Sequence, residues 1–442
     1  MLAPWATLKT VLSTTAFLTD RYELTMLQAA LKSGKAHRKG VFEVFSRNLA
    51  GGRRYGVFAG TGRLLDLIQQ FRFSPQEVSW LLEQKIVDQQ TADWLVNYKF
   101  SGDIHGYAEG ELYFPYSPVL IVESTFAEAV ILETLILSVL NYDSAVASAA
   151  ARMVTAAGER PVSEMGSRRT GEASAVAAAR AAYIAGFNAT SNLEAGRSFG
   201  IPTMGTASHA FTLLHDSEEQ AFKAQLEAFG EKTTFLVDTY NIETGIQNAI
   251  RVAGPNLGGV RIDSGDLPIE VGKARKLLDS LGAKGTKITV TNDLDEFAIA
   301  ALAAAPVDSY GVGTSVVTGS GVAAAGFVYK MVAFENETGD WLTVSKQSAK
   351  KSNVGGKKHA VRAHDDQHLA TAELISSVEP TLEKSDRNLL VSLVVGGEIQ
   401  EGTTGLAAVE TARAHHKKVK SALPAIAHRL TKGDAAIPTK FV

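Results

Sequence analysis

A regular alternation of short apolar runs and helical stretches begins near residue 233, and this alternation constrains the fold more than any other feature. Each run is rich in β-branched or apolar residues and ends in polar residues or glycine; the four runs are 233–240, 259–266, 287–293 and 309–315. Helical stretches such as 269–282 and 294–305 separate them. Neighbouring parallel strands need long crossover connections of this kind, so the pattern predicts successive βα units and a parallel sheet.

The length of 442 residues exceeds what one hydrophobic core usually holds, so we expect an α/β barrel with accessory parts. We expect an N-terminal α+β domain over residues 1–123 and a catalytic α/β barrel over 124–331. The C-terminal region, 332–442, is expected to pack partly on the N-terminal domain.

Outside the barrel, the sequence predicts several local elements. Residues 17–34 resemble a capped helix, and the alternating, glycine-punctuated residues 41–60 predict a hairpin. A second hairpin is predicted over 330–346 and a helix near 405–421. The apolar run 119–140 carries three glutamates, each costly in a bilayer, so it predicts a strand followed by a buried helix and no membrane span.

Composition excludes several classes of function. The net charge of −3, without a long basic block, argues against nucleic acid or an anionic membrane as a partner. The sequence contains no cysteine, which rules out disulfides, thiolate metal sites and a cysteine nucleophile, and fits a cytoplasmic protein. The first twenty residues make a poor signal peptide because their first positive charge, Lys9, falls where an apolar stretch is needed.

The carboxyl ends of parallel strands meet at one edge of a sheet, where ligand groups collect. The strand-end residues Asp238, Asp263, Asn292 and Gly313 are therefore expected to face one pocket.

The phrase GVRIDSGD, residues 259–266, combines Arg261, Asp263, Ser264 and Asp266 at one strand end. Carboxylates there suit the hydroxyls of a sugar and would favour positive charge developing on a ring carbon. Asp266 has an alternative interpretation as the N-cap of the following helix.

Three further stretches carry candidate binding groups. Gly313, Thr314 and Ser315 could form a lysine-free phosphate cradle, although such a turn is often only a turn. Arg168 and Arg169 suit a carboxylate or phosphate, but adjacent arginines cannot both face one way on a helix, so at least one could be a surface residue.

The phrase GTASHAFTLLH, residues 205–215, contains two histidines. His209 could cap or pack a helix, or it could be a reactive imidazole beside a phosphate site. His215 lies further into the helical run and is expected to be a surface or packing residue. Tyr22, taken alone, is expected to pack as an ordinary helix residue.

A set of phrases in a fixed order resembles the nicotinate phosphoribosyltransferase family. These phrases are TDRYELTM, FEVF-x-R, E-x-GSRRT, ATSN, GT-x-x-HAF, VRIDSGDL, TNDLDE and YGVGTSVVTG, and they run from about residue 17 to about 360. The resemblance implies a type II phosphoribosyltransferase fold, an irregular α/β barrel with an N-terminal α+β domain, usually in a homodimer with shared active sites. It also implies transfer of phosphoribosyl from phosphoribosyl pyrophosphate to nicotinate, as the first step of NAD salvage from nicotinate.

The resemblance further implies roles for single residues. Tyr22 would reach the neighbouring subunit's pocket and lie against the pyridine ring. Arg168, with Arg169 close by, would meet the nicotinate carboxylate or the ribose phosphate. Arg261 and Asp263 would hold the base and the ribose hydroxyls. The 5′-phosphate would be bound by Gly313, Thr314 and Ser315.

In the same family ATP is a co-substrate that phosphorylates the histidine of the GT-x-x-H phrase, here His209, and Mg²⁺ accompanies the departing pyrophosphate. Met165 departs from the pattern because relatives often have an aromatic residue there; a thioether can still pack on a ring face. Affinity for the base is the property that this departure affects.

Two alternatives to nicotinate transfer stay open. The sister enzyme for nicotinamide carries an aspartate where this chain has Ser191, so an uncharged Ser191 beside arginines favours a base with a carboxylate. A sugar-phosphate isomerase or aldolase, or a binding protein without turnover, is the second alternative, but none of the four strand ends offers a Schiff-base lysine. The stretch KKSNVGGKK, residues 350–358, either binds nucleotide phosphate or is a solvated basic loop.

Overall fold

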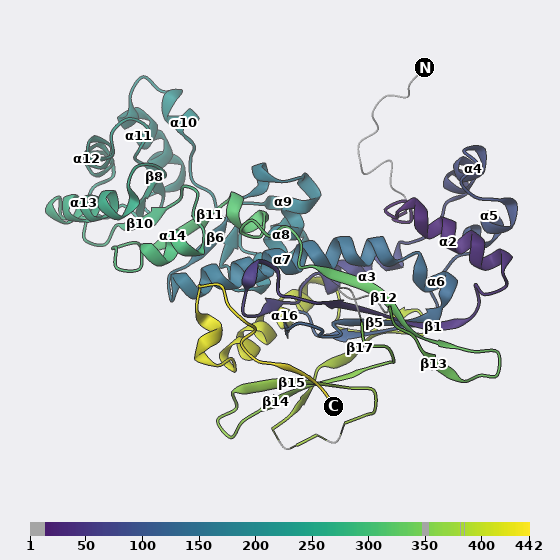
Figure 1. Cartoon of the computed structure of the whole chain (residues 1–442). Coiled ribbons are helices and arrows are strands. Elements are labelled where there is room, and N and C mark those ends of the chain that lie inside the picture. Colours follow the sequence, from purple (N-terminus) through teal and green to yellow (C-terminus); the bar gives the residue numbers. More distant parts are fainter. Residues whose placement is uncertain (1–13, 347–352, 381, 384) are drawn as a thin grey trace. The chain divides into compact units, whose positions relative to one another are not determined.

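The computed structural model describes residues 14–346, 353–380, 382–383 and 385–442 (Figure 1). The chain forms two compact units: unit 1 combines Met1–Ser144 with Ala324–Val442, and unit 2 is Ala145–Ala323. The expected domains were 1–123, 124–331 and 332–442, so their boundaries differ from those of the compact units. The division into domains stays a prediction. Of the nine residues of the stretch KKSNVGGKK, 350–352 lie outside the described residues. Lys357 and Lys358 form ion pairs with Glu123 and Glu43, and the choice between a nucleotide-phosphate site and a solvated basic loop stays a prediction.

Unit 1 is built on a seven-stranded sheet in which all neighbours run antiparallel. The strand order is β13 (Trp341–Thr343), β12 (Phe327–Glu335), β1 (Lys39–Ser46), β5 (Leu120–Thr125), β3 (Asp103–Tyr107), β17 (Leu390–Val395) and β18 (Glu398–Ile399). Seven of the eight residues of β1 are buried, because it is a central strand covered on both faces. The segment Ala324–Val442 therefore contributes four of the seven strands to a sheet that the N-terminal residues begin.

Helices and two small sheets complete unit 1. The helices are α2 (Arg21–Lys32), α3 (Thr61–Gln69), α4 (Pro75–Glu83), α5 (Gln89–Val96), α6 (Phe126–Val130), α16 (Gly405–Ser421) and the short η1 (Ala50–Gly52) and η3 (Ala425–His428). The small sheets are β16 (Arg387–Asn388), β14 (His359–His364), β15 (Ala370–Ser376) and β19 (Thr439–Phe441), and the pair β2 (Gly56–Val57) and β4 (Leu112–Tyr113). Helix α4 begins at a reciprocal capping box formed by Ser74 and Glu77.

The predicted hairpin over 41–60 is wrong. Strand β1 pairs with β5 and β12, whereas β2 pairs with β4, so the two predicted arms belong to different sheets. The segment between them contains η1 and does not make the tight turn that a hairpin needs. The hairpin β12–β13 and the helices α2 and α16 are confirmed.

The apolar run 119–140 forms strand β5, then α6, then the start of the long helix α7 (Glu133–Ala157), as predicted. By length and composition alone, Phe126–Ala157 would suffice to cross a membrane, but 67% of its most apolar window is buried inside the protein. A buried core helix passes the same test.

Unit 2 contains the predicted parallel sheet (Figure 1). Its strand order is β7 (Ala189–Thr190), β6 (Val162–Glu164), β11 (Ser309–Val312), β10 (Lys287–Val290), β9 (Gly259–Ile262) and β8 (Thr234–Leu236), with every pair parallel. The last four of these are the predicted βα strands. Within the residues the structure describes, the end strands β7 and β8 do not pair with each other, so the barrel is irregular.

The helices of unit 2 are η2 (Ser167–Arg169), α8 (Glu172–Ile184), α9 (Leu193–Phe199), α10 (His209–Leu213), α11 (Glu218–Phe229), α12 (Ile242–Ala253), α13 (Leu267–Ser280), α14 (Glu296–Ala301) and α15 (Thr314–Val317). Side chains at strand ends cap several of these helices: Asn241 caps α12, Asp266 caps α13 and Asp295 caps α14. Each strand therefore turns abruptly into a helix, and the polar residues of the turns gather at one edge of the sheet.

Candidate active site

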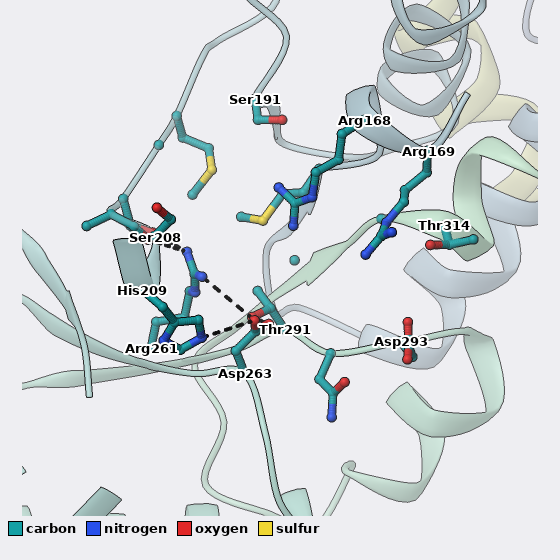
Figure 2. Close-up of a pocket in the computed structure, with 18 residues that line it drawn as sticks. Arg168, Arg169, Ser191, Ser208, His209, Arg261, Asp263, Thr291, Asp293 and Thr314 are labelled. Carbon is teal, nitrogen blue, oxygen red and sulfur yellow. Dashed lines mark hydrogen bonds and ion pairs between the residues drawn. The ribbon is translucent and has the colours of Figure 1, made fainter. Parts of the chain in front are cut away.

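A pocket of about 620 Å³ opens at the carboxyl ends of strands β6, β9, β10 and β11, within unit 2 (Figure 2). Its lining is polar and comes from six separate segments of the chain. The lining residues are Met165, Arg168, Arg169, Ser191, Met204, Gly205, Thr206, Ala207, Ser208, His209, Arg261, Asp263, Thr291, Asn292, Asp293, Gly311, Gly313 and Thr314.

Hydrogen bonds fix both the backbone and the side chain of Asp263. Its backbone N–H donates to Asp238 Oδ2 at 2.8 Å, and its own Oδ1 accepts a hydrogen bond from Thr291 Oγ1. The Asp263 side chain is 32% exposed, whereas that of Asp238 is 1% exposed. One carboxylate thus faces the pocket and a second, buried one fixes its position.

His209 begins helix α10 and places its ring between these two carboxylates. Nδ1 lies 3.1 Å from Thr239 Oγ1, and Nε2 lies 3.9 Å from Asp238 Oδ1 and 4.0 Å from Asp263 Oδ2. Asp238 Oδ1 is buried and has no hydrogen bond within the described residues. The His209 side chain is 41% exposed, so its ring is reachable from the pocket, and the carboxylates of Asp238 and Asp263 both lie near Nε2.

Arg261 connects the carboxylates to the loop before His209. Its Nη1 donates to Thr206 Oγ1 and to Ala207 O (3.2 Å), and its Nη2 lies 4.0 Å from Asp263 Oδ2. Burial lowers the pKa of Arg261, and the charge of Asp263 opposes that shift. Arg261 therefore supports the loop in addition to lining the pocket.

Arg168 and Arg169 lie on the short helix η2, and Figure 2 shows both side chains entering the pocket. The tight turn lets two adjacent arginines converge, which a regular α-helix would prevent. Thr314, the first residue of α15, lies on the same side of the pocket as Arg169 (Figure 2). Two guanidinium groups and the exposed N-terminus of a short helix make this wall suitable for anions.

Ser191 and Met165 also line the pocket. Met165 packs so close to strand β11 that its Sδ lies 2.7 Å from the position a Cβ on Gly311 would take. Glycine at 311 therefore makes room for the thioether at the pocket wall.

Several predicted residues lie elsewhere. Ser264 donates to Asp238 Oδ2 at 2.6 Å and faces a second cavity of about 580 Å³ beside α12 and α13. Asp266 is the N-cap of α13, and Ser315 does not line the pocket although Gly313 and Thr314 do. The expectation that all four strand-end groups face one pocket is wrong for Asp238. Its carboxylate does not line the pocket and instead accepts a hydrogen bond from the backbone N–H of Asp263.

Tyr22 belongs to unit 1, on helix α2, and is 44% exposed. Partial burial and the nearby carboxylates of Glu133 and Glu23 raise its pKa. His215 contacts its own segment of the chain: its Nδ1 lies 2.8 Å from Phe211 O, in keeping with a packing role.

Sequence reasoning missed Thr291, Asp293 and Thr239 and treated Asp238 only as a strand-end marker. Asn292 and Asp293 both have positive φ angles, 102° and 42°, in the turn after β10. A Thr-Asn-Asp run directly after a strand was the available signal for this turn.

The irregular parallel barrel has the fold of the type II phosphoribosyltransferases. It superposes on the crystal structure of human nicotinic acid phosphoribosyltransferase with a TM-score of 0.82 at 24% identity, covering 96% of this chain and 98% of that one. A nicotinate-nucleotide pyrophosphorylase from Pyrococcus furiosus matches with a TM-score of 0.77 at 22% identity, covering 96% and 98%.

The sequence defines the family more closely. The model of the nicotinate phosphoribosyltransferase N-terminal domain matches residues 17–141. The nicotinate phosphoribosyltransferase pncB1 of Mycobacterium tuberculosis is 52% identical over 435 residues, covering 96% of this chain and 95% of the relative. The Bacillus subtilis nicotinate phosphoribosyltransferase is 36% identical, covering 77% and 71%. The chain belongs to the nicotinate phosphoribosyltransferase family.

Proposed function

We propose that this chain transfers phosphoribosyl from phosphoribosyl pyrophosphate to the ring nitrogen of nicotinate, which gives nicotinate mononucleotide and pyrophosphate and begins NAD salvage from nicotinate. Membership of the family supports this activity. The observation that carries it in the structure is one pocket with two guanidinium groups on one wall and the carboxylate of Asp263 facing them.

The chemistry needs little acid or base help because the nucleophile is a lone pair already present on the ring nitrogen. The C1–pyrophosphate bond breaks as the C1–N bond forms, and the departing oxygen carries the electron pair. Asp263 would stabilise the positive charge that develops on the ribose, since Thr291 and Asp238 hold it in place beforehand. Arg168 and Arg169 would orient the carboxylate or phosphate groups.

The phosphate turn of this proposal is Gly313 and Thr314, with Ser315 as a candidate that the pocket lining does not include. Ser191 would favour the carboxylate of nicotinate over the amide of nicotinamide, because it adds no second negative charge beside the arginines.

We further propose that ATP is a co-substrate and that His209 accepts its γ-phosphate. The ring is reachable from the pocket, and a neutral imidazole is a competent nucleophile near neutral pH. Attack by a ring nitrogen forms the P–N bond and expels ADP; hydrolysis later returns phosphate.

Mg²⁺ would accompany the pyrophosphate. Across the described residues no group of three or more His, Asp or Glu side chains could hold a metal ion. Phosphate oxygens would thus supply most ligands, with Asp263 and Asp293 as the pocket carboxylates able to add to them. The ion would neutralise charge on the leaving group.

The remaining proposals concern partners and location. We infer small-molecule substrates, no nucleic-acid or membrane partner, a soluble cytoplasmic protein and a homodimer in which Tyr22 of one chain completes the site of the other. The 44% exposure of Tyr22 in the single chain supports the last point.

The test incubates purified protein with phosphoribosyl pyrophosphate and Mg²⁺, with nicotinate or nicotinamide, and with or without ATP. We expect nicotinate mononucleotide from nicotinate, and more of it when ATP is present. Faster product formation from nicotinamide would assign the chain to the sister reaction, and no product from either base would overturn the transferase proposal.

A further inference from the structure

Glu164 is a fully buried carboxylate that does not line the pocket. It is the last residue of strand β6, has 0% exposure, and directly precedes the loop of Met165, Arg168 and Arg169. Burial raises its pKa, and hydrogen bonds from Thr190 and Gly166 oppose that shift. A buried carboxylate is costly unless each oxygen has a donor, so its contacts explain why it is there.

Both oxygens of Glu164 are used, and they hold two different loops. Oε1 accepts from the backbone N–H of Gly166, at the start of the arginine turn, and Oε2 accepts from Thr190 Oγ1 at 2.6 Å. Its backbone carbonyl accepts from the N–H of Ser191 at 2.8 Å. One residue thus fixes the arginine turn and Ser191 relative to each other.

Thr190 extends this connection to a third loop. Its Oγ1 accepts from the N–H of Asn192 (3.0 Å), its N–H donates to Pro202 O (3.0 Å), and its carbonyl accepts from Met204 N–H (2.9 Å). Met204 begins the pocket-lining segment that ends at His209. The two buried residues Glu164 and Thr190 therefore contact three pocket-lining segments, at Gly166, Ser191 and Met204.

Packing leaves this arrangement little freedom. A Cβ placed on Gly166 would lie 3.0 Å from Glu164 Oε1 and 2.9 Å from Gly313 O. The turn that carries Arg168 and Arg169 therefore packs tightly between the Glu164 carboxylate and the loop of Gly313 and Thr314.

We propose that Glu164, acting through Thr190, is a positioning residue that keeps the arginine turn, Ser191 and the His209 segment in one common arrangement. The proposal deepens the proposed function and rests on it for its kinetic part. The pair touches no substrate; it sets the relative positions of groups that do.

The most informative variant is Glu164→Gln, which keeps the shape of the side chain. Its amide has a single acceptor oxygen, so it cannot accept hydrogen bonds from both Gly166 N–H and Thr190 Oγ1 as the two carboxylate oxygens do. A second, nearly isosteric variant, Thr190→Val, removes the hydroxyl, whereas Thr190→Ser keeps it. Glu159→Gln makes the same chemical change at an exposed position before β6 and is the matched control.

Hydrogen exchange followed by mass spectrometry on the substrate-free protein measures the positioning directly. We expect Glu164→Gln and Thr190→Val to exchange at least tenfold faster in peptides covering 165–170, 191–193 and 203–209 together. Thr190→Ser and Glu159→Gln should match the wild type. Faster exchange confined to one of the three segments, or a uniform increase over all of unit 2, would overturn the proposal.

Kinetics supply the second measurement. In Glu164→Gln and Thr190→Val we expect the KM values for nicotinate and for phosphoribosyl pyrophosphate to rise together, each by about tenfold or more. A lower kcat with both KM values unchanged would indicate only a smaller folded fraction and would contradict a positioning role. A wild-type protein inert towards nicotinate would defeat the proposed function, while the exchange measurement would still decide the role of Glu164.

Discussion

At the scale of single residues, the site depends on charges whose neighbours fix them before any substrate arrives. Asp263 is the clearest case, since its backbone and one carboxylate oxygen are both engaged while the other oxygen lies near His209. Groups held in this way need no rearrangement when charge develops during a reaction.

Asp263→Asn should lower kcat by about 10²-fold while the fold stays intact, because an amide keeps the shape but loses the charge that matters most in the oxocarbenium-like state. Steady-state kinetics with circular dichroism provides the measurement. Asp266→Asn is the matched control: Asp266 only caps α13, asparagine caps equally well, and its kcat should equal that of the wild type. Equal kcat values for the two variants would remove Asp263 from the mechanism.

His209→Ala should retain slow transfer without ATP but lose ATP hydrolysis and the stimulation by ATP. Incubation with γ-labelled ATP should leave acid-labile, base-stable label on the wild type and none on the variant. His215→Ala, whose histidine contacts Phe211 within the same helical turn, should be labelled like the wild type. Label of equal intensity on the His209→Ala protein would exclude this histidine as the acceptor.

At the scale of elements, sequence periodicity located the strands but not always their partners. The four βα strands are correct because each run is short, apolar and followed by a helix, a pattern that leaves only a parallel sheet. The arms of residues 41–60 are strands too, yet alternation carries no information about which strand lies beside which. Asp238 shows the same limit at the site, since its orientation depends on a contact with Asp263 far along the chain.

The contact between helices α2 and α7 contains a pH-dependent group. Glu23 is buried, accepts hydrogen bonds from Thr19 and Thr134, and has its pKa raised by burial to about 7. A carboxyl whose folded-state pKa exceeds its unfolded value stabilises the fold fully below the unfolded pKa of 4.5. That contribution is lost as the pH rises through about 7.

Glu23→Gln is permanently neutral and should escape this loss. Its thermal midpoint relative to the wild type should therefore increase between pH 5 and pH 8, corresponding to at most about 3 kcal/mol. Calorimetry at four pH values measures the difference. The exposed Glu83→Gln variant should follow the wild type at every pH, and a constant offset for Glu23→Gln would show that its carboxyl does not titrate in this range.

At the scale of the whole molecule, the proposed dimer predicts that two inactive variants can complement each other in a heterodimer. Tyr22 and Asp263 belong to different compact units, so if Tyr22 acts in the partner's pocket, a heterodimer would contain one intact composite site. Mixing inactive Tyr22→Ala and Asp263→Ala chains under subunit exchange should restore up to about a quarter of wild-type activity per chain. Mixtures of two preparations of Asp263→Ala should stay inactive, and the absence of recovery after verified exchange would contradict the shared site.

The order in which the chain is synthesised gives the two-segment composition of unit 1 a further consequence. Strand β1 emerges from the ribosome long before β12, and β3 long before β17, yet each pair is adjacent in the finished sheet. Unit 2 is a single continuous stretch and can complete its sheet while the early strands still have open edges. We therefore expect nascent chains to be most prone to aggregate before residues 390–395 appear, when the edges of β1 and β3 are still unpaired.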